Sequence, residues 1–206
     1  NETIYVCKTI VMSNPDSSLK DIAFFLDRDG TINKDVGYLH QIEHFELIPG
    51  SARAIKLLND QRFRVILVTN QSGIGVGLYT FDDLKKVNDE MARQLALQGA
   101  HIDAFYASPF HPEGRGEFQH PNHPDRKPNP GMLLRAIEEW HIDPRASWMI
   151  GDRSVDVQAG RRAGTKTCQV RSGIGGPTMD PDADLVADDL LEAVQLILNS
   201  SLESTL

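Results

Sequence analysis

The chain has 206 residues and a formal net charge of −8, a length that suits one well-filled hydrophobic core. A hydrophobic share of 40% and a charged share of 24% exclude a disordered or fibrous protein. The negative charge argues against a broad nucleic-acid-binding face, because binding to the phosphate backbone needs clustered Lys and Arg. A small anionic molecule can still bind where a few cations gather.

The two cysteines, Cys7 and Cys168, lie far apart, which excludes a disulfide scaffold and a four-thiolate zinc site. No apolar run approaches the roughly 20 residues that cross a bilayer. The first residues also lack the basic start and apolar centre of a signal peptide. We therefore expect a cytoplasmic protein with no membrane partner.

The first 20 residues differ in pattern from the rest. The alternating stretch "TIYVCKTIV" precedes "MSNPDSSLK", a Ser/Asn/Pro/Asp cluster that is typical of a loop. We assign 1–20 as an N-terminal extension, either an extra edge strand or a tail, and 21–206 as one domain.

Apolar runs and amphipathic stretches alternate along this domain. Continuous apolar strands that alternate with helices are typical of a parallel sheet covered on both faces, so we predict an α/β, Rossmann-like three-layer αβα sandwich with a mainly parallel sheet. The predicted strands span 22–27, 63–70, 102–110, 146–152 and 165–171, and the predicted helices span 51–61, 80–99, 129–142, 155–164 and 189–200.

One connection, 108–129, is long and polar. It holds four prolines before Pro128 and three histidines, and it exceeds the length of an ordinary link between a strand and a helix. We expect it to cover a functional site.

Polar residues follow four of the predicted strands, and carboxyl ends of parallel strands meet at one edge of a sheet. Two carboxylates that lie close together resist joint ionisation unless a cation sits between them, so Asp27 and Asp29 predict a bound cation. The shared placement predicts one site. Its candidates are Asp27, Asp29, Gly30 and Thr31; Thr69 and Asn70; Arg126 and Lys127; and Gly151, Asp152 and Asp156.

The segments "DRDGT", "TN", "RKP" and "GDRSVD", in this order, resemble the four motifs of the haloacid dehalogenase (HAD) superfamily of phosphotransferases. With "VGYLH", "VTNQSGIGVGLYT" and "HPE", they resemble more narrowly the branch of heptose-bisphosphate and histidinol-phosphate phosphatases. Apart from the predicted helix 51–61, no helical cap insertion separates the first two predicted strands, so we expect no large cap domain and a fairly open site.

The resemblance implies a Mg²⁺-dependent phosphomonoesterase that acts through an aspartyl phosphate. Asp27 would be the nucleophile and Asp29 the general acid and base. Thr69 and Lys127 would stabilise the transferring phosphoryl group. The metal ligands would be Asp27, the backbone carbonyl of Asp29, and Asp152, with Asp156 orienting Lys127 or a metal-bound water.

A second set of residues would bind the substrate. Arginine suits a bidentate grip on a second anionic group, which favours a bisphosphorylated sugar. The resemblance implies removal of the 7-phosphate of D-glycero-D-manno-heptose 1,7-bisphosphate, and we expect a monomer. Histidinol phosphate, another small sugar phosphate, and a non-catalytic phospho-ligand-binding role are the alternatives. The predicted substrate-binding residues are Asp35, Val36, Gly37, Tyr38, Asn70, Gln71, Ser72, Arg126 and Arg153.

The same branch usually carries a structural zinc in the loop before "RKP", held by paired Cys and His ligands. The corresponding positions here are Ser108 and Phe110, then His123 and Asp125. Because Ser and Phe cannot replace two soft ligands, we expect the zinc to be absent. His111, His120, His123 and Asp125 remain as alternative N/O donors, although we expect the histidines at the surface or pocket rim. The glycines of 73–77 predict a flexible turn that shapes the pocket.

Overall fold

The computed structural model describes residues 7–8, 21–174 and 178–203. Its sheet has the strand order β1-β4-β3-β2-β5-β6-β7. Strands β2 to β7 run parallel, and β1 pairs antiparallel with β4. The strands are β1 (Cys7–Lys8), β2 (Ala23–Leu26), β3 (Arg64–Asn70), β4 (Ala104–Ser108), β5 (Trp148–Gly151), β6 (Lys166–Val170) and β7 (Leu185–Ala187).

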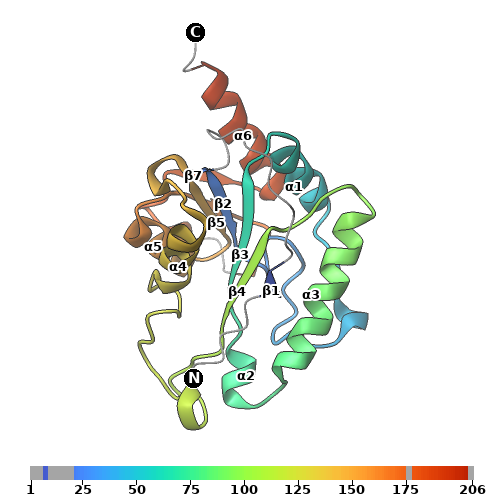
Figure 1. Cartoon of the computed structure of the whole chain (residues 1–206), viewed down its shortest axis with the longest axis vertical. Helices are drawn as coiled ribbons and strands as arrows, with labels where there is room; N and C mark the ends of the chain where they lie inside the picture. Colours follow the sequence, from blue (N-terminus) through green and yellow to red (C-terminus); the bar gives the residue numbers. More distant parts are fainter. Residues whose placement is uncertain (1–6, 9–20, 175–177, 204–206) are drawn as a thin grey trace.

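Helices cover both faces of this sheet (Figure 1). The α-helices are α1 (Ser51–Asp60), α2 (Ser72–Val76), α3 (Phe81–Ala96), α4 (Gly131–Trp140), α5 (Ser154–Ala163) and α6 (Leu190–Glu203). Short 3-10 helices span η1 (Ile42–His44), η2 (Gly116–Phe118) and η3 (Pro144–Ala146). Within the described ranges, no helix combines the length and the apolar character that crossing a membrane requires.

The buried strands divide their side chains between two cores. Phe24 and Leu26 of β2 pack with helices α1, α3 and α6 on one face, whereas Ala23 and Phe25 pack with α4 and α5 on the other. This follows from the two-residue period of a strand. The α/β three-layer fold predicted from the alternating apolar runs is therefore confirmed.

The structure differs from the sequence prediction in three details. Strand β7 was not predicted, and α3 ends at Ala96, before the expected Gly99. The stretch 73–77, expected as a flexible turn, lies mostly in helix α2. Its glycines permit close packing: a Cβ on Gly73 would lie 2.0 Å from the Tyr79 ring, and one on Gly75 would lie 2.2 Å from the Pro109 carbonyl oxygen. These glycines therefore allow close packing against α2 and do not indicate a flexible turn.

Of the N-terminal extension, only Cys7 and Lys8 lie within the described residues. They pair antiparallel with Phe105 and Ala104 of β4, as an extra edge strand would. The remainder of the predicted extension, 1–6 and 9–20, lies outside the described residues.

Candidate active site

The strand order creates a crevice at the carboxyl end of β2. From β2 the chain continues to β3 and β4 on one side, and β5, β6 and β7 follow on the other side. Connections that leave in opposite directions open a ligand site at such a switch point. Asp27 directly follows β2, Thr69 and Asn70 end β3, and Asp152 directly follows β5.

A tight turn places the first of these residues. The backbone N–H of Asp27 donates to the Ile150 carbonyl oxygen at 2.9 Å, which fixes the end of β2 against β5. Gly30 then takes a positive φ of 83°, which glycine adopts without a Cβ penalty. A Cβ there would lie 2.7 Å from Asp152 Oδ2. Gly30 therefore lets the loop after β2 close onto Asp152.

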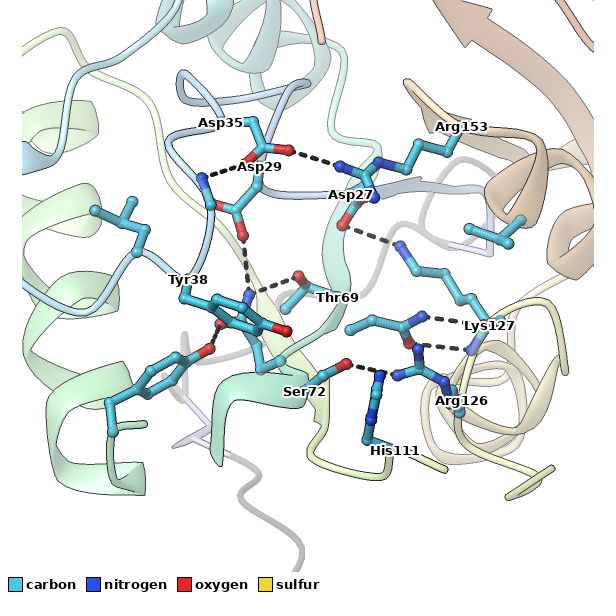
Figure 2. A pocket seen from close by; sticks show the side chains of 16 residues that line it. Asp27, Asp29, Asp35, Tyr38, Thr69, Ser72, His111, Arg126, Lys127 and Arg153 are labelled. Atoms are coloured by element: carbon cyan, nitrogen blue, oxygen red, sulfur yellow. Dashed lines mark hydrogen bonds and ion pairs between the residues drawn. The ribbon is translucent and has the colours of Figure 1, made fainter. Parts of the chain in front are cut away.

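Lys127 reaches the same point from the long loop. Its side chain is 1% exposed, and its Nζ lies 2.9 Å from Asp27 Oδ1 and 2.6 Å from Asp156 Oδ1. Nζ also donates to the Val68 carbonyl oxygen at 2.9 Å. The Asn70 side chain holds the Lys127 backbone by donating to its carbonyl oxygen and accepting from its N–H, both at 3.0 Å. These contacts fix the ammonium beside Asp27 (Figure 2).

Asp27, Asp152 and Asp156 form a buried acidic cluster whose carboxylate oxygens lie within 4.8 Å of one another. Burial, partly offset for Asp27 by the charge of Lys127, raises the pKa of Asp27 to about 6. Burial and the neighbouring carboxylates raise the pKa of Asp152 to about 7. A proton or a cation is therefore favoured between these groups.

The donor set fits Mg²⁺. Neither buried oxygen of Asp152 accepts a hydrogen bond from any described residue, although Arg153 Nε lies 3.6 Å from Oδ2. Buried carboxylate oxygens without hydrogen bonds are costly. Oxygen donors of this kind are those that Mg²⁺ prefers. Both oxygens of Asp156 are engaged, Oδ1 by Lys127 and Oδ2 by the backbone N–H of Arg153, whereas Lys127 contacts Asp27 through Oδ1. Asp27 and Asp152 are therefore the side chains best suited to hold the metal.

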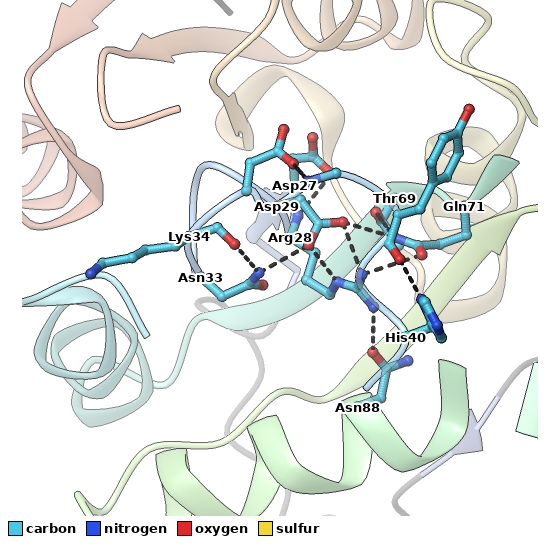
Figure 3. A network of polar contacts seen from close by, with 12 residues as sticks. Asp27, Arg28, Asp29, Asn33, Lys34, His40, Thr69, Gln71 and Asn88 are labelled. Atoms are coloured by element: carbon cyan, nitrogen blue, oxygen red, sulfur yellow. Dashed lines mark hydrogen bonds and ion pairs between the residues drawn. The ribbon is translucent and has the colours of Figure 1, made fainter. Parts of the chain in front are cut away.

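Asp29 has a different environment, although it lies only two residues from Asp27. Arg28 is fully buried and donates from Nε to Asp29 Oδ1 at 3.1 Å and from Nη2 to Oδ2 at 2.9 Å. The Asn33 amide adds a bond to Oδ1 at 2.9 Å (Figure 3). Burial alone would raise the pKa of Asp29, but the charge and hydrogen bonds of Arg28 lower it. Two neighbouring carboxylates thus acquire opposite pKa shifts.

These groups open onto a cavity of about 400 Å³. Its lining joins most of the residues that the strand ends and the resemblance singled out. Val36 lies outside the lining, and Asp152 and Asp156 are buried beneath it. The predicted residues in the lining are Asp27, Asp29, Asp35, Gly37, Tyr38, Thr69, Asn70, Gln71, Ser72, Arg126, Lys127 and Arg153.

Four further residues line the cavity: Leu39, Tyr79, His111 and Val155. The placement of His111 agrees with the expected pocket rim. Leu39, Tyr79 and Val155 were not predicted, although all three lie in segments that the resemblance quoted, because Leu39 and Val155 are apolar and Tyr79 lies away from the strand end. Only the tertiary fold brings them to the site.

Two arginines lie at the wall of the cavity (Figure 2). Arg153 donates to Asp35 Oδ2 at 2.8 Å, so its charge is partly compensated. Arg126 donates from Nη1 to Ser72 Oγ at 2.6 Å and to the Phe110 carbonyl oxygen at 2.7 Å. No carboxylate of the described residues forms an ion pair with Arg126, and burial lowers the pKa of its guanidinium. An anion in the cavity would supply the missing counter-charge.

The loop positions that would hold zinc make other contacts. Phe110 and His123 stack with ring centroids 3.3 Å apart, and Asp125 pairs with Arg135. Nδ1 of His111, of His120 and of His123 each accepts from the backbone N–H two residues on. Within 7–8, 21–174 and 178–203, the acidic cluster is the one group of potential metal donors. The side chains at the positions corresponding to zinc ligands thus make contacts with one another and with Arg135.

Comparison with known proteins agrees with this geometry. The HAD-hydrolase-like family model matches residues 125–193. The chain is 45% identical over 152 residues to the D-glycero-beta-D-manno-heptose-1,7-bisphosphate 7-phosphatase of Pasteurella multocida, covering 73% of this chain and 82% of that protein. It is 42% identical over 174 residues to the enzyme of that name from Escherichia coli K12, covering 84% and 89%.

A solved structure shares both the fold and the sequence pattern. The D,D-heptose 1,7-bisphosphate phosphatase from B. bronchiseptica, complexed with magnesium and phosphate, superposes with a TM-score of 0.77 at 29% identity, covering 87% of this chain and 99% of that one. Together with the carboxylates, lysine and threonine at the strand ends, these similarities show that the chain is a phosphatase and belongs to the HAD superfamily, in the same family as these relatives.

Proposed function

We propose that this phosphatase removes the 7-phosphate of D-glycero-D-manno-heptose 1,7-bisphosphate through an aspartyl phosphate on Asp27. The observation that carries the substrate assignment is Arg126, a cation without a carboxylate partner among the described residues, in the same cavity as Asp27 and Lys127. A substrate with one phosphate at each end can place one phosphate beside Asp27 and Lys127 and the other beside Arg126. The names of the relatives support the choice of sugar.

In the first step, a carboxylate oxygen of Asp27 attacks phosphorus and the bond from phosphorus to the sugar oxygen breaks. Asp29 gives a proton to the departing alkoxide. Asp29 is ionised in the resting site. The arriving phosphate dianion raises its pKa because like charges disfavour joint ionisation, so Asp29 takes up from solvent the proton that it then gives to the alkoxide. In the second step, water attacks the same phosphorus while Asp29 takes its proton, which releases phosphate and restores Asp27.

Charge stabilisation is the main requirement of this transfer. Lys127 is held beside Asp27 and would neutralise the phosphoryl oxygens, and the Thr69 hydroxyl and the Asn70 backbone amide would donate to them. Asp27 and Asp152 would hold Mg²⁺, together with the backbone carbonyl of Asp29. When bound, the metal supplies positive charge to the reacting phosphate. We assign Asp156 to orienting Lys127, because the two side chains form a 2.6 Å ion pair.

The remaining cavity residues would bind the sugar and its second phosphate. Arg126 and Arg153 carry the charge, and Ser72 orients Arg126 through its 2.6 Å contact. Asp35 orients Arg153 through its 2.8 Å bond, and Gly37 and Tyr38 also line the cavity. We also propose a zinc-free loop, because its stacked rings and the ion pair of Asp125 occupy the corresponding positions. The protein would act as a cytoplasmic monomer.

The two arginines predict a selective defect. Arg126→Ala should reduce kcat/KM for heptose 1,7-bisphosphate by roughly tenfold to a hundredfold, since a charge-assisted bond contributes about 1.5 to 3 kcal/mol. Its effect on a generic monophosphate should be much smaller. Arg153→Ala should cost less than Arg126→Ala, because Arg153 shares its charge with Asp35. Steady-state phosphate release on both substrates measures these ratios.

Arg115→Ala is the matched control, since Arg115 belongs to the same loop but is exposed and lies outside the cavity lining. Arg115→Ala should leave kcat/KM unchanged for both substrates. Arg126→Lys keeps the charge and should recover part of the loss. Equal losses on both substrates would mean that the arginines support the reacting phosphate or the loop, and the bisphosphate assignment would lose its structural basis.

A phosphate-release screen tests the proposed function directly. The panel contains heptose 1,7-bisphosphate, histidinol phosphate and several sugar monophosphates, each assayed with Mg²⁺. We expect the highest kcat/KM for the heptose bisphosphate. A clear preference for histidinol phosphate or for a monophosphate would show that the preferred compound, and not the heptose bisphosphate, is the substrate. No phosphate release from any of them would favour a binding role.

A further inference from the structure

The side-chain amide of Gln71 connects two groups of the proposed reaction. Gln71 follows β3 and is 2% exposed. Its Nε2 donates to Asp29 Oδ2 and to Thr69 Oγ1, both at 3.0 Å (Figure 3). An amide nitrogen carries two hydrogens, so both are used. One side chain therefore contacts the proposed general acid and the proposed phosphoryl-binding hydroxyl.

The orientation of this amide is fixed from the opposite side. Gln71 Oε1 accepts from the Tyr79 hydroxyl at 2.6 Å and from Arg28 Nη2 at 3.2 Å. A flipped amide would set its carbonyl oxygen against the Asp29 carboxylate, which only accepts, and its NH₂ against the Arg28 guanidinium, which only donates. The Thr69 and Tyr79 hydroxyls could reverse their roles, but these two contacts could not. Asp29 and Arg28 thereby select the orientation in which Gln71 donates to Asp29 and Thr69, and the Tyr79 hydroxyl, by donating to Oε1, holds the amide in that position.

Tyr79 itself is held in place. Its ring packs over Gly73, where a Cβ would lie 2.0 Å away, and it stacks on His40 with centroids 5.5 Å apart and planes within 3°. Tyr79 is 7% exposed. The hydroxyl that orients Gln71 thus comes from a ring whose position the surrounding packing determines.

The two hydrogen bonds that Gln71 Nε2 donates affect both Thr69 and Asp29. Thr69 Oγ1 accepts from Gln71, so the hydroxyl hydrogen of Thr69 is available to donate to another acceptor, such as a phosphoryl oxygen in the cavity. Asp29 Oδ2 accepts from both Gln71 and Arg28, which restricts rotation of the carboxylate. Positioning of this kind lowers a barrier only when the geometry is held closely.

We propose that Gln71 is a positioning residue, oriented by Tyr79, that holds Asp29 and Thr69 in their working orientations. The sequence prediction placed Gln71 in contact with substrate, whereas its amide is here fully used by protein groups. The inference rests on the proposed function for the roles of Asp29 and Thr69. It is independent of which sugar phosphate the enzyme prefers.

The test compares Gln71→Met and Tyr79→Phe with the wild type on phenyl phosphate and 4-nitrophenyl phosphate. Phenolate is the poorer leaving group, so its departure depends more on proton donation from Asp29. Gln71→Met should lower kcat for both substrates through Thr69, and lower it roughly tenfold more for phenyl phosphate. Tyr79→Phe should change the ratio of the two kcat values in the same direction but by a smaller factor, because Arg28 still contacts Gln71 Oε1.

Tyr106→Phe is the matched control. It also removes a buried tyrosine hydroxyl, but that hydroxyl contacts Glu139 and Trp140 of α4. It should leave the ratio of the two kcat values unchanged, and thermal melts monitored by circular dichroism establish that each variant is folded. Equal losses on both aryl phosphates in folded Gln71→Met and Tyr79→Phe would overturn the inference.

This design separates the inference from the proposed function. If the wild type hydrolyses both aryl phosphates but not heptose 1,7-bisphosphate, the proposed substrate is wrong, and the ratio still decides the role of Gln71. If heptose 1,7-bisphosphate is hydrolysed and the ratio is constant across the variants, the proposed function stands and the positioning role is rejected.

Discussion

Asp27→Asn is expected to reduce phosphate release on the order of 10⁴-fold or more, because an amide keeps the shape of the side chain but cannot attack phosphorus. The fold should persist. Burial and Asp156 raise the pKa of Asp27 to about 6, so the folded protein disfavours its charge. In addition, Lys127 keeps Asp156 as a partner at 2.6 Å. Steady-state phosphate release and thermal melting measure the two properties separately.

Asp103→Asn provides the matched control for this substitution. Asp103 is also a buried carboxylate, but it accepts from the Val65 N–H at 2.8 Å and pairs with Arg64, away from the cavity. Its loss should lower the melting temperature and leave kcat nearly unchanged. Asp27→Asn with kcat within about tenfold of the wild type would remove Asp27 from the role of nucleophile.

Removal of Mg²⁺ should also abolish activity, and added Mg²⁺ should restore it. The pKa values of Asp27 and Asp152 are raised to about 6 and about 7 in the metal-free site. Below these values protons occupy the carboxylates that the metal needs, so the apparent affinity for Mg²⁺ should fall as the pH decreases from about 8 to about 6. Titration of chelator-treated protein with Mg²⁺ across this range measures the effect.

Asp152→Asn serves as the comparison in this titration. It should weaken Mg²⁺ binding at every pH and flatten the pH dependence, because one of the two titrating ligands is gone. Elemental analysis of the purified protein should find no stoichiometric zinc, since Phe110 and His123 stack and Asp125 pairs with Arg135. One tightly held zinc per chain, or full activity after removal of Mg²⁺, would contradict this account of the metals.

The sequence predicted the site well where polar residues directly follow apolar strands. Apolar runs predicted five of the parallel strands, and the polar residues that follow them predicted that Asp27, Thr69, Lys127 and Asp152 meet. This succeeds because parallel strands bring their carboxyl ends to one edge. The helix start at Thr80 was likewise predictable, since its side chain and that of Asp83 form a capping box.

The sequence could not show how the side chains beside these residues are used. Arg28 lies between Asp27 and Asp29 in the sequence, yet only the fold buries it against the Asp29 carboxylate. Tyr79 follows a glycine-containing stretch that looked like a turn, and its contact with Gln71 depends on α2. The two arginines also differ for a tertiary reason, because Asp35 pairs with Arg153 across 118 positions of the chain.

The proposed reaction is tested most directly by following heptose 1,7-bisphosphate by phosphorus NMR during turnover by the wild type with Mg²⁺. We expect the 7-phosphate signal to be replaced by that of inorganic phosphate while the 1-phosphate signal remains, and we expect Asp27→Asn to leave both signals unchanged. Loss of the 1-phosphate first, or an unchanged spectrum with an enzyme that hydrolyses 4-nitrophenyl phosphate, would contradict the proposed reaction.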